Sequence, residues 1–245
     1  MEKVGKIMAI YVTGDIHGEI DIHKLSSKRL FKNQINLTKN DYLIICGDFG
    51  LVWYYSDMKG YKSDQYWLKW LANKPWTTLF VDGNHENFDL LETFPIEEWN
   101  GGKVQHIVKD KVIHLMRGQI FNIEGNSIFT FGGAASHDKA IRLQGINWWP
   151  QEIPRVREES EGIRNLEKHN NEIDYIITHC APYSFEDKIF RNYYSNTLTE
   201  YFQMLYGNIA NFKHWYCGHY HISETFDNIT CLYNKIIPLG NKIDK

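Results

Sequence analysis

The most informative stretch of the chain is MAIYVTGDIHG, at residues 8–18. Its first part, residues 8–13, is a continuous apolar and β-branched run, which is typical of a strand buried on both faces. Asp15 and His17 follow at once, each next to a glycine. The stretch therefore predicts a buried strand that presents a carboxylate and an imidazole just beyond its carboxyl end.

The same arrangement recurs along the chain. Further buried strands are predicted at residues 42–46, 77–81, 175–178 and 215–217, and helices at residues 25–31 and 66–71. Alternation of strand and helix in the first part predicts a parallel sheet at the core. Ligands of open α/β sheets bind outside the carboxyl ends of the strands, so polar side chains that follow these strands are candidates for one common site.

The middle of the chain has a different pattern. Residues 105–133 contain short β-rich runs at 112–116, 119–123 and 127–131, the last two separated by the hairpin-like residues 124–126. These runs predict a second, more antiparallel sheet. Residues 156–169 have helical periodicity, and residues 185–212 are aromatic and partly helical. Because no linker or repeat divides the sequence, we expect a single domain over residues 1–245.

The side chains that follow the predicted strands are of the types that bind transition metals. Besides Asp15 and His17 they are Asp48, Asn84, His85, His179, His219 and His221. Carboxylate, imidazole and amide donors together suit Mn, Fe or Zn, rather than an all-oxygen calcium site or an all-thiolate zinc site. Two such ions ~3.5–4 Å apart suit in-line displacement at phosphorus.

Five blocks in order carry a resemblance to a known family. They read Asp-x-His, Gly-Asp, Gly-Asn-His-Glu, His and Gly-His-x-His, between Asp15 and His221. The sequence thus resembles the calcineurin-like metallophosphoesterase superfamily. The resemblance implies an α/β fold with two mixed β-sheets packed as a sandwich and flanked by helices. It also implies a dimetal-dependent hydrolase of phosphoester bonds, with two divalent ions that are Mn, Fe or Zn.

The resemblance further assigns a role to each residue. The first metal ion would be held by Asp15, His17 and His221. The second would be held by Asn84, His179 and His219. Asp48 would bridge both ions, a hydroxide between them would attack phosphorus, and His85 would assist the leaving group without binding metal.

The second block departs from one branch of the superfamily. Ser/Thr protein phosphatases and dinucleotide polyphosphatases carry Gly-Asp-x-Val-Asp-Arg-Gly, whereas this chain has GDFGLVW at residues 47–53. The aspartate that partners the catalytic histidine and the phosphate-binding arginine are both missing. A phosphodiesterase or phosphomonoesterase is therefore favoured. Those two phosphatase classes, and a non-catalytic scaffold that binds a protein partner, remain alternatives. Arg142, in the irregular residues 134–153, is our candidate for phosphate binding in place of the missing arginine.

Composition limits the partners. Lys and Arg total 27 against 30 Asp and Glu, a net charge of −3, so bulk nucleic-acid binding is not expected. No run approaches the ~20 apolar residues of a membrane span, so we expect no membrane partner. The four cysteines form no C-x-x-C pair, which favours reduced thiols and a cytoplasmic location. The expected partner is a phosphoester substrate.

Overall fold

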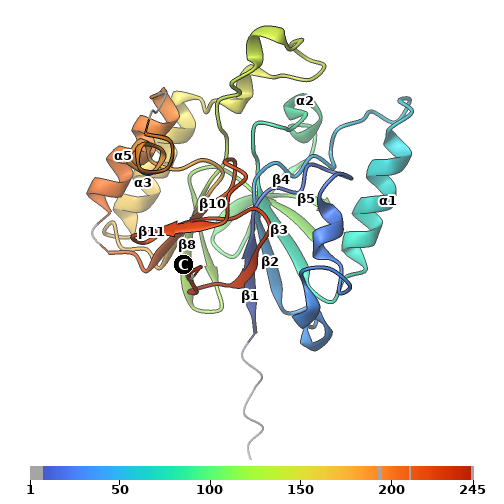
Figure 1. The fold of residues 1–245 in the computed structure, drawn as a ribbon, viewed down its shortest axis with the longest axis horizontal. Helices are drawn as coiled ribbons and strands as arrows, with labels where there is room; N and C mark the ends of the chain where they lie inside the picture. The colour runs from blue at the N-terminus through green and yellow to red at the C-terminus, as the bar shows by residue number, and fades with distance from the viewer. Residues whose placement is uncertain (1–7, 192–194, 210, 244–245) are drawn as a thin grey trace, which may run out of the picture.

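Two mixed β-sheets pack face to face and carry helices on their outer faces (Figure 1). This computed structural model describes residues 8–191, 195–209 and 211–243. Apolar side chains from both sheets fill the space between them, among them Val12 and Leu79 of one sheet and Phe121 and Ile177 of the other. The arrangement confirms the predicted fold class.

The seven-stranded sheet has the order β13-β1-β2-β3-β6-β5-β4. Its parallel centre consists of β1 (Ile10–Thr13), β2 (Tyr42–Cys46), β3 (Thr77–Val81) and β6 (Val112–Leu115). Antiparallel pairing adds β13 (Ile236–Pro238) at one edge, and β5 (Gly102–Val108) and β4 (Ile96–Trp99) at the other. The predicted parallel core is confirmed.

The six-stranded sheet has the order β11-β12-β10-β9-β8-β7. Its strands are β7 (Gln119–Ile123), β8 (Asn126–Phe131), β9 (Tyr175–Thr178), β10 (His214–Cys217), β11 (Glu224–Phe226) and β12 (Ile229–Cys231). The prediction that this sheet is more antiparallel was wrong, because β8, β9, β10 and β12 are mutually parallel. The connections from β8 to β10 contain helices, and such crossovers join parallel strands. The run at residues 112–116 corresponds to β6, which belongs to the other sheet.

Helices cover both outer faces. Against the seven-stranded sheet lies α1 (Tyr61–Ala72), whose Leu68 and Leu71 are buried. Against the six-stranded sheet lie α3 (Val156–Lys168), α4 (Tyr183–Phe190) and α5 (Thr197–Asn208). The short α2 (Phe88–Leu91) follows β3. In the part of the chain that the structure describes, every helix is too short or too polar to cross a lipid bilayer.

The prediction of a helix at residues 25–31 was wrong. A 3-10 turn (Ile22–Leu25) ends at this point, and Ser26 continues in an extended conformation with ψ 148°. A second 3-10 turn follows (Lys32–Asn36). Leu25 and Phe31 are nevertheless buried, and the ring of Phe31 lies 5.0 Å from that of Trp76. Leu25 and Phe31 therefore pack into the core separately from an irregular segment, and this accounts for the apolar spacing that favoured a helix.

Candidate metal centre

Five strands end at one place and supply the predicted site residues. Asp15 and His17 follow β1, Asp48 follows β2, and Asn84 and His85 follow β3. From the other sheet, His179 follows β9, and His219 and His221 follow β10. The site thus lies where the carboxyl ends of parallel strands from both sheets meet, as the rule for open α/β sheets predicts.

Glycines make room for these side chains. A Cβ atom on Gly47 would lie 2.2 Å from Nδ1 of His179, and one on Gly218 would lie 2.1 Å from Oδ1 of Asp15. One on Gly83 would lie 2.1 Å from Oδ1 of Asp48. Any larger residue at these three positions would displace a site residue, which explains why glycine precedes the functional side chains in the motifs.

Asp48 lies at the centre of the cluster. Its Oδ2 lies 3.2 Å from Nε2 of His17, and its Oδ1 lies 3.2 Å from Nε2 of His179. Nε2 of His179 is also 3.2 Å from Oδ1 of Asn84. One carboxylate therefore offers a separate oxygen to each side of the site, which is the geometry that a bridging ligand needs.

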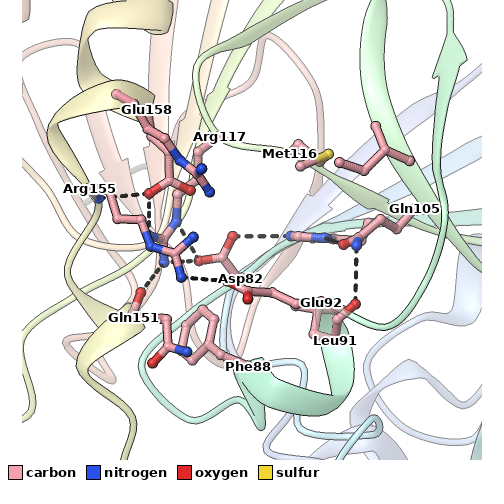
Figure 2. Close-up of a pocket in the computed structure, with 13 residues that line it drawn as sticks. Asp82, Phe88, Leu91, Glu92, Gln105, Met116, Arg117, Gln151, Arg155 and Glu158 are labelled. Carbon is pink, nitrogen blue, oxygen red and sulfur yellow. Dashed lines mark hydrogen bonds and ion pairs between the residues drawn. The ribbon is translucent and has the colours of Figure 1, made fainter.

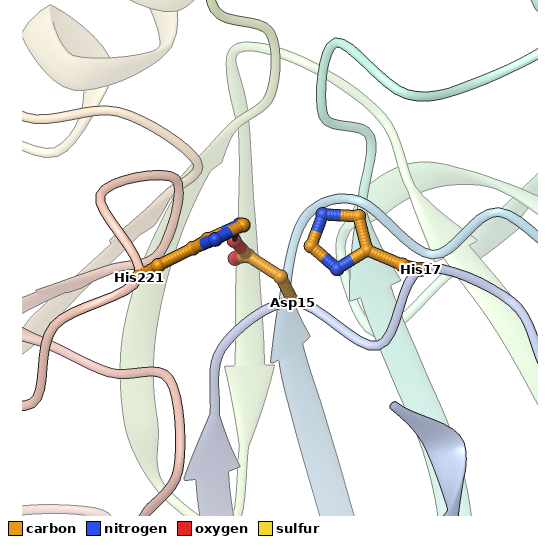
Figure 3. A group of neighbouring side chains, drawn as sticks. All are labelled: Asp15, His17 and His221. Atoms are coloured by element: carbon orange, nitrogen blue, oxygen red, sulfur yellow. Dashed lines mark ion pairs between the residues drawn. The ribbon is translucent and has the colours of Figure 1, made fainter. Parts of the chain in front are cut away.

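Asp15 and His221 face each other next to His17 (Figure 3). Nε2 of His221 lies 3.2 Å from Oδ2 of Asp15. One ligand atom from each of Asp15, His17 and His221 lies within 4.8 Å of the others. Oδ1 of Asp15 accepts a hydrogen bond of 3.0 Å from the backbone N–H of His219, whose ring lies 5.0 Å from that of His179. The seven predicted metal ligands are thus brought together.

The backbone at this site is strained. Four of the seven predicted ligands have left-handed φ angles: His17 (42°), Asp48 (45°), His219 (68°) and His221 (52°). Each such residue costs on the order of 1–3 kcal/mol and persists where the surrounding structure holds it. Strain of this kind concentrates at functional sites because it aims side chains that an ordinary strand or turn would point elsewhere.

Neighbouring groups fix which ring nitrogen of two histidines faces the site. Nδ1 of His17 lies 3.0 Å from Oδ2 of Asp21, and Nδ1 of His179 lies 2.7 Å from the carbonyl oxygen of Cys46. Both partners accept, so each Nδ1 carries a proton, and Nε2, which faces Asp48, is the nitrogen that would bind a metal ion once it loses its own proton. Metal-binding histidines show this pattern, in which the other ring nitrogen donates to a carboxylate or carbonyl.

The amide of Asn84 is oriented by a buried chain of hydrogen bonds. Its Nδ2 donates to Oγ of Ser136 at 3.2 Å, and that hydroxyl donates to Oε2 of Glu152 at 2.5 Å. Oε1 of Glu152 also accepts the backbone N–H of Ser136 at 3.0 Å. With Nδ2 held in this way, Oδ1 of Asn84 faces His179. Sequence analysis missed both Ser136 and Glu152, which lie in the irregular residues 134–153.

The carboxylates and imidazoles of the site shift one another's pKa values. Burial alone would raise the pKa of Asp48, but His179 and His17 outweigh it and hold that pKa well below its usual range. Burial would lower the pKa of His179, but Asp48 and Asp15 raise it to about 10. Burial and the nearby His179 lower the pKa of His219 to about 3. Metal binding releases protons from histidine ligands, and the imidazoles so deprotonated would join the two carboxylates and the amide oxygen of Asn84 in a donor set that fits Mn, Fe or Zn.

His85 and Arg142 lie together at the edge of the cluster. The ring of His85 lies 5.5 Å from that of His17, and its backbone N–H donates to Oδ1 of Asp48 at 2.8 Å. Nη1 of Arg142 lies 3.3 Å from Nδ1 of His85. Arg142 also donates to Oδ1 of Asp138 at 2.6 Å and to the carbonyl oxygen of Asn147 at 3.0 Å. The loop that carries Arg142 therefore reaches the site.

A buried ion pair supports the turn after β3 (Figure 2). Oδ2 of Asp82 accepts from Nε of Arg117 at 2.9 Å, and Oδ1 lies 3.1 Å from Nε2 of His114. Burial would raise the pKa of Asp82, but Arg117 and His114 lower it. Arg117 also donates to the carbonyl oxygen of Gln151 at 2.9 Å. The pair joins the strand end that carries Asn84 to the segment that carries Glu152, a link that sequence motifs do not indicate.

Comparison with known proteins agrees with this picture. The two-sheet sandwich with clustered carboxylate, imidazole and amide donors is the arrangement expected of a metallophosphoesterase. A model of the calcineurin-like phosphoesterase family matches residues 8–223. The match covers most of the chain, so the protein belongs to this family, and the predicted resemblance is confirmed.

Curated relatives include lariat debranching enzymes. One from Danio rerio is 28% identical over 189 residues, which are 71% of this chain and 31% of the relative. One from Caenorhabditis elegans is 30% identical over 194 residues, 74% of this chain and 38% of the relative. Lariat debranching enzyme A of Xenopus laevis is 31% identical over 127 residues, 48% of this chain and 23% of the relative. The matches thus span well under half the length of these relatives.

Proposed function

We propose that this protein hydrolyses phosphodiester bonds with the help of two divalent transition-metal ions. The observation that carries the proposal is the position of Asp48, with one carboxylate oxygen toward His17 and the other toward His179, at 3.2 Å each. On one side of Asp48, the proposed ligands are Asp15, His17 and His221. On the other side, they are Asn84, His179 and His219.

The bound ions would supply a hydroxide nucleophile at neutral pH and neutralise charge on the phosphoryl group. The protein's own residues supply the rest. A guanidinium can only donate, so the contact from Arg142 makes Nδ1 of His85 the acceptor and leaves the proton of the neutral ring on Nε2. That N–H can donate to the departing oxygen. Arg142 has further N–H groups with which to hold a non-bridging phosphate oxygen.

Two observations favour a diester over the other substrates that the sequence left open. The relatives that match over most of this chain are named lariat debranching enzymes. The Asp-Arg pair of protein phosphatases and dinucleotide polyphosphatases is absent after Asp48. A purely scaffolding role would not require eight metal-competent or proton-donating side chains to lie together, four of them at strained backbone positions.

The proposal is tested by metal content and turnover together. Purified protein should contain close to two transition-metal ions, as measured by elemental analysis. It should hydrolyse bis-p-nitrophenyl phosphate faster than p-nitrophenyl phosphate, and chelation followed by added Mn should remove and restore the activity. Asp48→Ala should lose metal and activity, whereas Asp187→Ala, an exposed control on α4, should keep both. Absence of metal, with activity unaffected by Mn, would contradict the proposal.

A further inference from the structure

A pocket opens directly beside the proposed catalytic groups. It has a volume of about 250 Å³, and its lining includes His17 and His85 on one side and Ile20, Trp53 and Tyr54 on the other. We call it the Trp53 pocket. Its volume lies just below the ~300–1,000 Å³ of sites for drug-sized ligands, so it suits a single ring system.

The aromatic wall of the Trp53 pocket is held in place before any ligand binds. Oδ2 of Asp64 accepts the backbone N–H groups of Trp53 at 3.0 Å and of Tyr54 at 2.9 Å. The carbonyl oxygen of Trp53 accepts from Nδ2 of Asn87 at 2.8 Å, and the Trp53 ring packs edge-on against Trp149 at 5.5 Å. A wall fixed in this way loses little conformational entropy when a ring binds against it.

The floor of the pocket is bare backbone. Gly18 and Gly50 both line it, with φ angles of 57° and 65°. A Cβ on Gly18 would lie 2.6 Å from the carbonyl oxygen of Gly50, and one on Gly50 would lie 2.8 Å from the backbone N of Gly18. The two turns therefore approach so closely that neither position can carry a side chain, and the pocket stays open.

The polar groups of the pocket disfavour a second phosphate. Among the described residues that line it, none is a lysine or arginine, whereas Glu19 and Asp64 both contribute carboxylates. Glu19 is exposed and accepts a hydrogen bond from the hydroxyl of Ser63. An uncharged planar group with N–H donors satisfies such a pocket, because aromatic faces stack on it and carboxylates accept from it.

We propose that the Trp53 pocket binds the base of the nucleoside that leaves when the diester is cleaved. This rests on the proposed function, because His85 defines the side on which the alcohol departs. A nucleobase combines a flat ring for Trp53 and Tyr54 with N–H groups for Glu19, which in adenine, guanine and cytosine include an exocyclic amino group. A phenol ring, as in phosphotyrosine, offers the flat ring without these donors.

The test compares two substrates that differ only in the leaving group. The dinucleotide d(ApA) releases a nucleoside, and the methyl ester of 2′-deoxyadenosine 3′-phosphate releases methanol. Stacking of one base is worth ~1–3 kcal/mol, so Tyr54→Ala should lower kcat/KM for d(ApA) by about 5- to 150-fold. The same variant should leave kcat/KM for the methyl ester within about two-fold. Tyr66→Ala, an exposed tyrosine on α1 outside the pocket, is the matched control and should change neither.

Binding is measured separately from turnover. Saturation-transfer NMR should show 2′-deoxyadenosine bound to the parent protein and to Tyr66→Ala, and a weaker signal with Tyr54→Ala. Trp53→Phe should retain binding, since a ring remains. Each of three results would overturn the pocket assignment. The first is an equal loss of kcat/KM for both substrates in Tyr54→Ala, and the second is absence of nucleoside binding. The third is faster turnover of a phosphotyrosine peptide than of d(ApA). If the metal-loaded parent cleaves neither ester, the proposed function fails, and the nucleoside measurement still decides the pocket.

Discussion

Arg142 Nη1 lies 3.3 Å from Nδ1 of His85, a contact between residues 57 positions apart in the chain. In the related phosphatases that carry Gly-Asp-x-Val-Asp-Arg-Gly, an aspartate is the expected partner of this histidine. Here the contact comes from a cation on the loop after β8. Burial and Arg142 both lower the pKa of His85, although Asp48 opposes them. The pair therefore favours a neutral His85 with its proton on Nε2.

Arg142 should contribute to both binding and turnover. Arg142→Ala should raise KM for phosphodiesters several-fold and lower kcat, because it removes a phosphate donor and the group that orients His85. Arg142→Lys should restore KM only in part, since an ammonium cannot bind bidentately. Steady-state kinetics with unchanged metal content is the measurement. Arg155→Ala, at an exposed pair with Glu92, is the control. Kinetics equal to those of the parent would exclude Arg142 from the site.

His85→Ala should keep both metal ions and lower kcat by about 10²- to 10⁴-fold for esters with alkoxide leaving groups. The loss should be smaller for p-nitrophenyl esters, because p-nitrophenolate departs without a proton. His169→Ala, an exposed histidine after α3, should behave as the parent. Elemental analysis checks that the metal ions are retained. Measuring kcat for a series of esters with different leaving groups checks the dependence on the leaving group. Loss of a metal ion in His85→Ala would instead make His85 a ligand, since its ring lies within 4.8 Å of the donor atoms of His17 and Asp48.

Ser136 and Glu152 should act on metal affinity through Asn84. Ser136→Ala removes the acceptor of Nδ2, so the amide can rotate and its Oδ1 is no longer held toward His179. Loss of such a supporting hydrogen bond typically costs ~10–100-fold in metal affinity. Titration of Ser136→Ala with Mn should show a lowered affinity for one of the two ions, and Ser136→Thr should restore that affinity. Two ions bound as tightly as in the parent would contradict this role.

Arg117 should matter mainly for stability. Its pair with Asp82 is buried, and removing one partner leaves an uncompensated charge. Arg117→Met should therefore lower the free energy of unfolding by ~3–5 kcal/mol, measured by urea denaturation. Arg155→Met breaks the exposed pair with Glu92 and should cost no more than ~1 kcal/mol. Figure 2 shows both arginines in one view. If both variants lost a similar amount of unfolding free energy, burial would not be what makes the pair of Arg117 with Asp82 important for stability.

The sequence alone located the residues that the strand ends bring together. Asp15, Asp48 and Asn84 each follow a short apolar, β-branched run that is typical of a buried strand, and parallel strands place their carboxyl ends at one edge. The flanking glycines are local features as well, because the turns need space for neighbouring side chains. For these reasons, periodicity, motif order and family resemblance were sufficient to predict the fold class and the metal-competent cluster.

Tertiary structure alone decided the partners that lie far apart in sequence. No local pattern shows that β6 pairs with β3, that β8, β9 and β10 run parallel, or that residues 25–31 are irregular. The same holds for Ser136 beside Asn84, Arg117 beside Asp82 and Arg142 beside His85. Strand order and side-chain hydrogen bonds of this kind depend on packing across the whole molecule, so they are fixed only when both sheets and their connecting loops close around the site.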